Sequence, residues 1–283
     1  MDRLDAQLLL LHALGRQAGD RAWLIAHDTD DLPRLAADRF EALVRRRRDG
    51  EPLAYITGVK EFHGLELTVD ARVLVPRPDT ETLVNWALDL LDRPEACART
   101  LPCSVLDLGT GSGAVALALK AARPALDVTA TDASFDALAV AQANARRLGL
   151  ALEFAQGSWF DAAQGRYHLI VSNPPYVAQH DAHLAALRHE PRSALVSGPD
   201  GLDDLRQIVE HAPGHLHPGG WLLLEHGWDQ AAAVRTLLAA AALEQVQSRP
   251  DLAGMERCSG GRMPPDRRAD ERIGGETRPA LRR

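Results

Sequence analysis

The fold of this chain is decided by the stretch Val105-Leu106-Asp107-Leu108-Gly109-Thr110-Gly111-Ser112-Gly113. It begins as a buried strand, and the glycines that follow permit a tight turn in which the backbone can approach a ligand. Residues 114–120 then have the composition of a helix. A strand, a glycine-rich turn and a helix N-terminus in this order are typical of a nucleotide-binding α/β domain.

The same alternation of strand and helix continues along the chain. Strands are predicted at residues 127–131, 152–154, 169–172, 221–225 and 244–247, and helices at residues 82–91, 135–148, 202–212 and 230–242. Such an alternation is typical of helices that cover both faces of a sheet. We therefore predict an α/β fold with a Rossmann-like, doubly wound sheet.

The first part of the chain has a different pattern. Apolar side chains recur at helical spacing at Leu4, Leu8, Leu11 and Leu14, and further helical stretches follow around residues 21–25 and 35–48. Residues 53–75 alternate apolar and polar positions, which predicts a β-hairpin. We expect a helical N-terminal domain over residues 1–50, a β-hairpin linker over 51–75, a catalytic domain over 76–262 and a disordered tail over 263–283.

Four consecutive arginines, residues 45–48, end the third of these helices. Cations suit the negative end of a helix dipole, and Gly50 can terminate the helix. A second interpretation stays open, in which this basic patch contacts an acidic or phosphate-bound partner.

The glycine-rich turn is the candidate cofactor-binding loop, formed by Gly109, Thr110, Gly111, Ser112 and Gly113. Asp132 ends the second predicted strand, about twenty residues further on, where a carboxylate can accept both hydroxyls of a ribose. Asp132 could instead cap the following helix, although Ser134 is better placed to do so. Trp159 follows the third strand and could lie beside an adenine ring or simply belong to the core.

The tetrapeptide Asn173-Pro174-Pro175-Tyr176 follows the apolar run at residues 169–172. The Asn173 carboxamide offers an acceptor and an NH2 donor, and neither proline has an N–H that would occupy nearby carbonyl groups. Such acceptors can hold a planar NH2 group, against which the ring of Tyr176 could lie. Taken alone, the tetrapeptide could also be a proline-rich turn after a buried strand.

The candidate residues together resemble a known family. Their order and spacing are similar to those of the class I S-adenosyl-L-methionine-dependent methyltransferases, through Asp107, the glycines, Asp132, Trp159 and Asn173. From about residue 51 to residue 262 the chain resembles the HemK/PrmC family of peptide chain release factor N5-glutamine methyltransferases. The segments that carry this resemblance are residues 50–58, 75–81, 107–113, 171–176 and 222–227.

The resemblance implies a function. Members of this family transfer a methyl group from S-adenosyl-L-methionine to the side-chain amide nitrogen of the glutamine in the GGQ motif of class I peptide chain release factors, which modulates translation termination. Catalysis and glutamine binding would involve Asn173, Pro174, Pro175 and Tyr176. The cofactor would be bound by Gly109, Thr110, Gly111, Ser112, Gly113, Asp132, Trp159 and Asn173. In the family the segment that contains Arg77, Asp79 and Glu81 lies over the cofactor pocket, with no chemical role assigned to these three.

Two other functions stay open. Tetrapeptides of this kind serve planar NH2 groups generally, so the chain could be an N6-adenine methyltransferase acting on DNA or RNA. It could also bind S-adenosyl-L-methionine without catalysis. The first alternative lacks an evident target-recognition domain, and the second leaves the substrate motif without a purpose.

Composition limits the choice further. The chain has 283 residues, of which 46% are hydrophobic, so it can bury a large core. Its net charge of −7 argues against sequence-specific or broad nucleic-acid binding, which depends on clustered Lys and Arg. There is no apolar run of about 18 residues and no signal-peptide pattern at the start. We therefore expect a soluble, cytoplasmic protein without membrane contacts.

Cysteine and histidine positions indicate no metal site. The cysteines, Cys97, Cys103 and Cys258, are scattered, and we expect them to be reduced thiols. The segment after the tetrapeptide contains His180, His183, His189 and Glu190. Their spacing fits no compact ligand motif, so we interpret this segment as a substrate-facing loop.

Overall fold

A seven-stranded sheet forms the centre of the structure, a computed structural model that describes residues 1–93 and 102–265. Its strands are β3 (Ser104–Leu108), β4 (Asp127–Asp132), β5 (Glu153–Gln156), β6 (Tyr167–Ser172), β7 (Leu216–Glu225), β8 (Glu244–Pro250) and β9 (Glu256–Arg262). They lie in the order β5-β4-β3-β6-β7-β9-β8, and β9 runs antiparallel to both its neighbours. The chain order reverses between β3 and β6, where doubly wound sheets bind ligands at the carboxyl ends of their strands.

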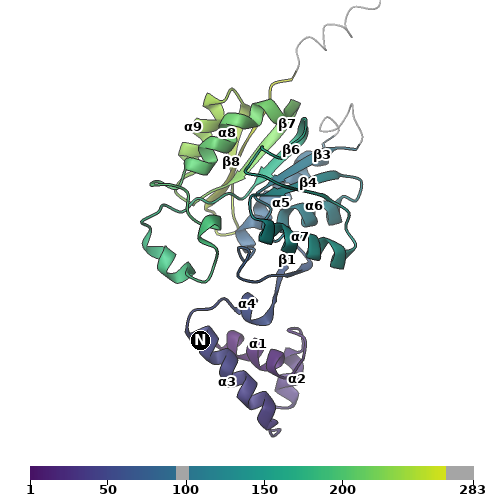
Figure 1. Cartoon of the computed structure of the whole chain (residues 1–283), viewed down its shortest axis with the longest axis vertical. Coiled ribbons are helices and arrows are strands. Elements are labelled where there is room, and N and C mark those ends of the chain that lie inside the picture. The colour runs from purple at the N-terminus through teal and green to yellow at the C-terminus, as the bar shows by residue number, and fades with distance from the viewer. Residues whose placement is uncertain (94–101, 266–283) are drawn as a thin grey trace, which may run out of the picture.

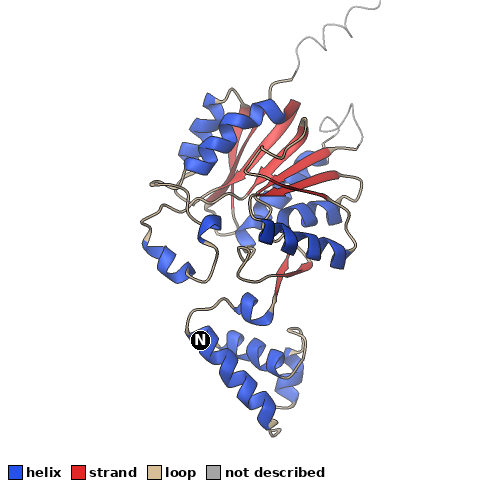
Figure 2. Cartoon of the chain, viewed as in Figure 1, coloured by secondary structure: helices blue, strands red, loops and turns tan. Residues whose placement is uncertain are grey.

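Helices cover both faces of this sheet, as Figures 1 and 2 show. One face carries α5 (Glu81–Leu91), α6 (Ala114–Ala122) and α7 (Phe135–Leu148), and the other carries α8 (Asp203–His215) and α9 (Ala231–Ala240). Successive strand residues point to opposite faces, so Leu223 of β7 lies in the first core and Leu222 and Leu224 lie in the second. The predicted doubly wound α/β fold is confirmed.

The chain begins with three helices, α1 (Arg3–Ala13), α2 (Arg21–Ala26) and α3 (Arg34–Arg48). A short helix, α4 (Leu53–Thr57), and the antiparallel hairpin of β1 (Val59–Phe62) and β2 (Leu65–Thr68) follow. The expected hairpin is thus shorter than predicted, because residues 53–57 are helical. Pro52 precedes α4, and Gly58 ends it in the left-handed conformation at φ 77°. The division of the chain into domains stays a prediction.

Ion pairs within the chain occupy most of the arginine patch at the end of α3. Arg45, Arg46 and Arg47 pair with Glu41, Glu51 and Asp5 at 3.7, 2.5 and 2.6 Å. Contact of this patch with a partner stays a prediction. Three of its four arginines are already neutralised by carboxylates of the same chain. In the part of the chain that the structure describes, no helix is long and apolar enough to cross a membrane.

One buried side chain ties the hairpin to the candidate cofactor loop. Asn144 of α7 accepts a hydrogen bond from the Thr68 N–H (2.8 Å) and donates to the carbonyl groups of Thr68 and Ser112 (3.0 Å each). A fully buried amide with all these bonds fixes the backbone segments it joins. The sequence offers no signal for this role, because an Asn within a helix is usually neutral or unfavourable.

Strand β9 is the strand of the central sheet that we did not predict. Its residues Gly260 and Gly261 look like a turn, because glycine weakens a strand interior. The structure gives the reason for Gly260: a Cβ there would lie 2.5 Å from Leu223 Cδ2 of the neighbouring strand. Pairing extends to Met263, whose N–H donates to the Gly220 carbonyl at 2.7 Å. Met263 is therefore ordered, although we expected the disordered tail to begin there; residues 266–283 lie outside the described part, and the expectation for them stays a prediction.

Thr80 precedes α5, but its side chain makes no capping bond to the helix; its hydroxyl is used by other groups described below. Cys103 is disulfide-bonded, whereas Cys258 is a buried free thiol. The expectation of reduced thiols therefore does not hold for Cys103.

Candidate active site

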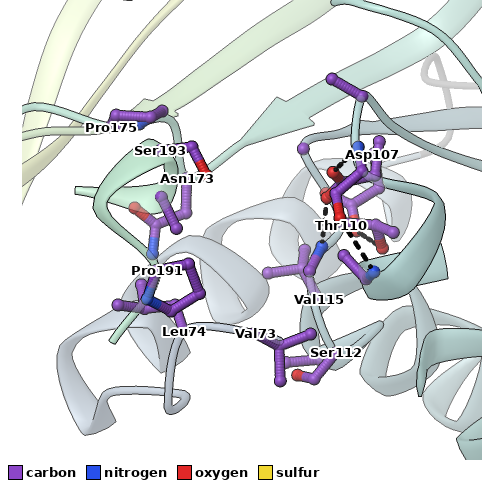
Figure 3. Close-up of a pocket in the computed structure, with 18 of the residues that line it drawn as sticks. Val73, Leu74, Asp107, Thr110, Ser112, Val115, Asn173, Pro175, Pro191 and Ser193 are labelled. Carbon is purple, nitrogen blue, oxygen red and sulfur yellow. Dashed lines mark hydrogen bonds between the residues drawn. The ribbon is translucent and has the colours of Figure 1, made fainter. Parts of the chain in front are cut away.

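A cavity of about 320 Å³ lies at the carboxyl ends of β3, β4 and β6, where the strand order reverses. The glycine loop forms one wall, and the segments that follow β4 and β5 form another. Residues 72–76 and Thr80 close it from the side of the hairpin. Figure 3 shows the wall formed by Asn173, Pro175, Pro191 and Ser193 across the cavity from Asp107 and Thr110.

The glycine loop is shaped by its left-handed residues. Gly109, Gly111 and Gly113 have φ values of 69°, 56° and 84°, which side chains with a Cβ rarely adopt. Gly111 lines the cavity, and a Cβ built on it would meet no protein atom within 4 Å. A Cβ on Gly109 would lie 3.4 Å from the ring of Trp159. The loop therefore leaves open space in front of Gly111 for a ligand.

The first residue of the glycine motif carries a buried carboxyl group. Asp107 is 2% exposed, and its Oδ2 accepts from the Thr110 hydroxyl (2.7 Å) and the Ala116 N–H (3.2 Å). Burial raises the pKa of Asp107 to about 7, although these two bonds oppose the rise. Asp107 lines the cavity, so its carboxylate can attract a cationic group there. We had not assigned Asp107 to the site, since an acid in a strand gives no local sign of its function.

Asp132 lies at the end of β4, also on the cavity wall. Its Oδ2 accepts from the Gly111 N–H at 2.9 Å, and its Oδ1 accepts from the Ser134 N–H at 2.8 Å. Ser134 caps α7, as expected, by accepting from the Ala137 N–H. Burial raises the pKa of Asp132. A carboxylate has further lone pairs, so ribose binding by Asp132 stays a prediction alongside its role in the loop.

Asn173 lines the cavity and has an unused acceptor. Its Nδ2 donates to the Thr80 hydroxyl oxygen at 3.3 Å, whereas its Oδ1 is buried without a hydrogen-bond partner. An unpaired buried acceptor costs about 1–3 kcal/mol, so a native site that retains one needs an explanation. A ligand NH2 group would satisfy it. Pro175 and Trp159 line the same cavity.

Three of the residues that we assigned to the site do not line the cavity. Gly113 is the N-cap residue of α6, and a Cβ there would lie 2.8 Å from Leu117 Cδ1, so packing already requires a glycine and its predicted contact with the cofactor stays a prediction. Pro174, which follows Asn173 in the sequence, is buried. Tyr176 turns its hydroxyl to Glu225 Oε1, at 3.3 Å. The predicted contacts of Pro174 and Tyr176 with a substrate stay predictions.

Glu225 is a buried acid that we did not predict to belong to the site. It ends β7 and is 1% exposed. Burial raises its pKa to about 7, and the hydroxyl groups of Thr80 and Tyr176 oppose the rise. One oxygen accepts from Tyr176, and the other, Oε2, is buried without a well-formed hydrogen bond.

The segment of unassigned role before α5 makes three separate contacts. Arg77 forms an ion pair with the buried carboxylate of Glu190, which also accepts from the Val75 N–H at 3.1 Å. Asp79 lies 3.5 Å from Arg257, and Glu81 accepts from the His63 N–H at 3.2 Å. Glu190 immediately precedes the cavity residues Pro191, Ser193 and Ala194. The pair of Arg77 and Glu190 therefore fastens one wall of the cavity to the hairpin side.

The histidines of this loop form no metal centre. Among the described residues, no group of three or more His, Cys, Asp or Glu side chains could hold a metal ion. His183 contacts Asp181, and His189 contacts the Asp49 carbonyl oxygen at 3.1 Å.

Known proteins resemble this chain over nearly its whole length. Residues 95–198 match the methyltransferase small domain, and residues 1–58 match the PrmC N-terminal domain. The chain is 52% identical over 265 residues to the release factor glutamine methyltransferase of Bordetella pertussis, which covers 92% of this chain and 95% of that one. It is 50% identical over 268 residues to the enzyme of the same name from Xylella fastidiosa, which covers 93% and 94%.

A solved structure shows the same fold. The 16S rRNA N2 G1207 methyltransferase of T. thermophilus, in complex with AdoMet and guanosine, has a TM-score of 0.51 and 20% identity, and the match covers 72% of this chain and 49% of that one. This likeness concerns the fold alone. By its identity to the curated relatives, the chain belongs to the release factor glutamine methyltransferase family.

Proposed function

We propose that this protein transfers a methyl group from S-adenosyl-L-methionine to the side-chain amide nitrogen of the glutamine in the GGQ motif of class I peptide chain release factors. Membership of the family supports the reaction and the class of substrate. The observation that carries the assignment to this cavity is the buried, unpaired Oδ1 of Asn173, which can accept from an amide NH2 group.

The cavity suits the proposed methyl donor. Its carboxyl groups, Asp107 and Asp132, can receive the donor's ammonium group and ribose hydroxyls, and Gly111 leaves room for the donor's backbone-like chain. Trp159 offers a flat apolar surface for the adenine ring. When bound, S-adenosyl-L-methionine supplies an electrophilic methyl group on a positively charged sulfur.

The chemistry of an amide determines what the protein has to do. An amide nitrogen is a poor nucleophile, because its lone pair is delocalised into the carbonyl group. The protein therefore has to hold the nitrogen in line with the methyl–sulfur bond, and such positioning can contribute ~7–11 kcal/mol to lowering a barrier. On this proposal, Asn173 accepts one N–H of the glutamine, and the carbonyl group of Pro174 accepts the second.

The reaction balances without a strong base. The new nitrogen–carbon bond forms as the carbon–sulfur bond breaks, and S-adenosylhomocysteine leaves with both electrons of that bond. The methylated amide nitrogen is strongly acidic at this stage, so it loses its proton to water or to a backbone carbonyl group. No described side chain beside Asn173 has to remove that proton first.

Mass spectrometry of a treated release factor tests this proposal. The protein is incubated with S-adenosyl-L-methionine and either a class I release factor or bulk DNA and RNA. One added methyl group on the GGQ glutamine supports the proposal, and methylated adenine without methylated release factor would replace it. Asn173→Ala should leave donor affinity almost unchanged while removing most turnover. Equal loss of both would show that Asn173 serves donor binding instead.

A further inference from the structure

Glu225 has an unusual environment for an acid with no role in the reaction described so far. Leu224 pairs with Ser172 across β6 and β7, so Glu225 and Asn173 are the next residues at the ends of adjacent parallel strands. Burying a carboxyl group costs free energy unless a cation or several donors compensate. Arg257 lies near, but it pairs with Asp79 and Asp251.

The contacts of Glu225 lead directly to Asn173. Tyr176 donates its hydroxyl to Oε1 at 3.3 Å, whereas Oε2 is buried without a hydrogen-bond partner among the described residues; the Thr80 hydroxyl lies near enough to lower the pKa of the same carboxyl group. Thr80 is 3% exposed, and its oxygen also accepts from Asn173 Nδ2 at 3.3 Å. Asn173 is therefore hydrogen-bonded to Thr80, and Thr80 lies beside a buried carboxylate oxygen of Glu225 that lacks a donor.

The chemistry of these groups determines which of them donates each hydrogen bond and which accepts it. An ionised carboxylate can only accept, so a hydrogen bond between Thr80 and Glu225 uses the single hydroxyl proton of Thr80. The Thr80 oxygen then has only lone pairs to offer Asn173, and it can bind the NH2 end of the carboxamide but not the carbonyl end. The NH2 end is thereby occupied, and Oδ1 is left as the end of the carboxamide that can accept from the substrate.

We propose that Glu225 is a positioning residue that acts through Thr80 to fix the carboxamide of Asn173 with its carbonyl oxygen toward the substrate. This inference rests on the proposed function. A site fixed in this way accepts an NH2 donor such as glutamine and disfavours a carboxylate such as glutamate, because Oδ1 would face a second acceptor. Glu225 thus contributes to the choice of an amide over an acid.

The same arrangement makes turnover depend on pH. The titratable and charged groups that face Glu225 are Tyr176, Asp79, Arg257 and Cys258. Burial raises the pKa of Tyr176 and of Cys258, so both stay protonated near neutral pH, and Asp79 and Arg257 offset each other. Glu225 is therefore the group of this set that changes charge near pH 7. Once protonated, Glu225 can donate to Thr80, and the order of donors and acceptors that fixes Asn173 is lost.

Substitutions at Thr80 and Glu225 test this order of donors and acceptors. Thr80→Val removes the hydroxyl at nearly constant volume, Thr80→Ser restores it, and Glu225→Gln adds an NH2 group that can donate to Thr80. The readouts are kcat and KM at saturating S-adenosyl-L-methionine, the donor Kd by calorimetry, and thermal unfolding. Ser259→Ala removes a buried hydroxyl at the same end of the sheet, bonded to His226 instead, and serves as the matched control.

Thr80→Val and Glu225→Gln should each lower kcat by about tenfold or more while the donor Kd stays within about twofold, and Thr80→Ser should recover most of the loss. Wild-type kcat should rise with pH through about 7 and then level off, and this step should disappear in Glu225→Gln. Ser259→Ala should keep wild-type kinetics.

A second measurement, of selectivity between amide and acid, would be unaffected if Glu225 had only a structural role. A release factor whose GGQ glutamine is replaced by glutamate serves as a competitive inhibitor, and its Ki is compared with the KM of the normal substrate. The ratio should fall in Glu225→Gln, because the carboxamide can then turn. Unchanged kcat, pH step and ratio in Glu225→Gln would overturn the inference, as would a Thr80→Ser variant no better than Thr80→Val. If wild-type protein fails to methylate the release factor, the proposed function itself is wrong.

Discussion

Replacing glycines of the cofactor loop one at a time should distinguish two effects of an added Cβ: the loss of space for the ligand and the strain of a left-handed backbone. Gly111 and Gly113 are both left-handed, at φ 56° and 84°, but a Cβ would meet different surroundings at each. At Gly111 it would enter open space at the cavity wall, and at Gly113 it would lie 2.8 Å from Leu117 Cδ1. Gly149, which ends α7 at φ 68° with no atom within 4 Å of such a Cβ, is the matched control.

The magnitudes follow from these surroundings. An alanine in the left-handed conformation costs ~1–2 kcal/mol of folding free energy, and this cost applies to Gly149→Ala, Gly111→Ala and Gly113→Ala alike. Gly113→Ala adds ~1–3 kcal/mol, because Leu117 is fully buried and has to shift. Gly111→Ala adds nothing to this cost in the ligand-free protein, yet its methyl group occupies space assigned to the donor. We expect its donor Kd to rise at least ~10-fold, equivalent to ~1.4 kcal/mol of binding.

Two measurements on each variant test this reasoning. Urea unfolding without ligand gives the stability, and titration calorimetry with S-adenosyl-L-methionine gives the donor Kd. Gly111→Ala should match Gly149→Ala in stability and differ from it only in donor affinity. The assignment of the cavity as the donor site would be refuted if Gly111→Ala bound the donor within about twofold of wild type while Gly149→Ala did the same.

Three further predictions follow from buried polar groups. Because burial raises the pKa of Asp107 to about 7, the fraction that is ionised falls below that pH, so donor affinity should weaken as pH drops below about 7; calorimetry should show this trend in wild type and none in Asp107→Asn. Asn144→Ala removes three hydrogen bonds and should cost about 3 kcal/mol, at ~1 kcal/mol each, in urea unfolding; a loss under about 1 kcal/mol would contradict the tie between hairpin and loop. Arg77→Ala and Glu190→Ala should each raise the donor Kd about threefold or more, and the double variant should show no further rise, since both act through one ion pair; additive effects in a double-mutant cycle would exclude this coupling.

The parts of the fold that the sequence predicted are those with local signals. The helix at residues 135–148 was predicted with the bounds of α7, because Ser134 caps it and Gly149 ends it. The strand before Gly109 was clear from its apolar run and the glycines that follow. Strand β9 was missed because its glycines are required by side chains distant in sequence, Gly260 by Leu223 and Gly261 by Leu243. No local pattern contains that information.

The residues of the candidate site likewise fall into those with a local sequence signal and those without one. Gly111, Asp132 and Asn173 could be proposed from their places at the ends of predicted strands, and the structure brings all three to one cavity. Thr80 and Glu225 could not, because each comes from a segment with a satisfactory structural explanation of its own, a helix entry and a buried strand. Only the packing of their segments places both beside Asn173.

The polarity of the cavity explains how one set of groups can serve two ligands. The side chains proposed to contact them, Asp107, Asp132 and Asn173 Oδ1, are all acceptors or acids. On the proposed function, the donor arrives with two positive charges, on its ammonium group and its sulfonium, and the substrate glutamine arrives with N–H groups, so both are attracted by the same kind of surface. Transfer of the methyl group removes the positive charge from sulfur and one N–H from the amide. Each product therefore makes fewer favourable interactions with the cavity than the molecule from which it formed, which favours release after a single methylation.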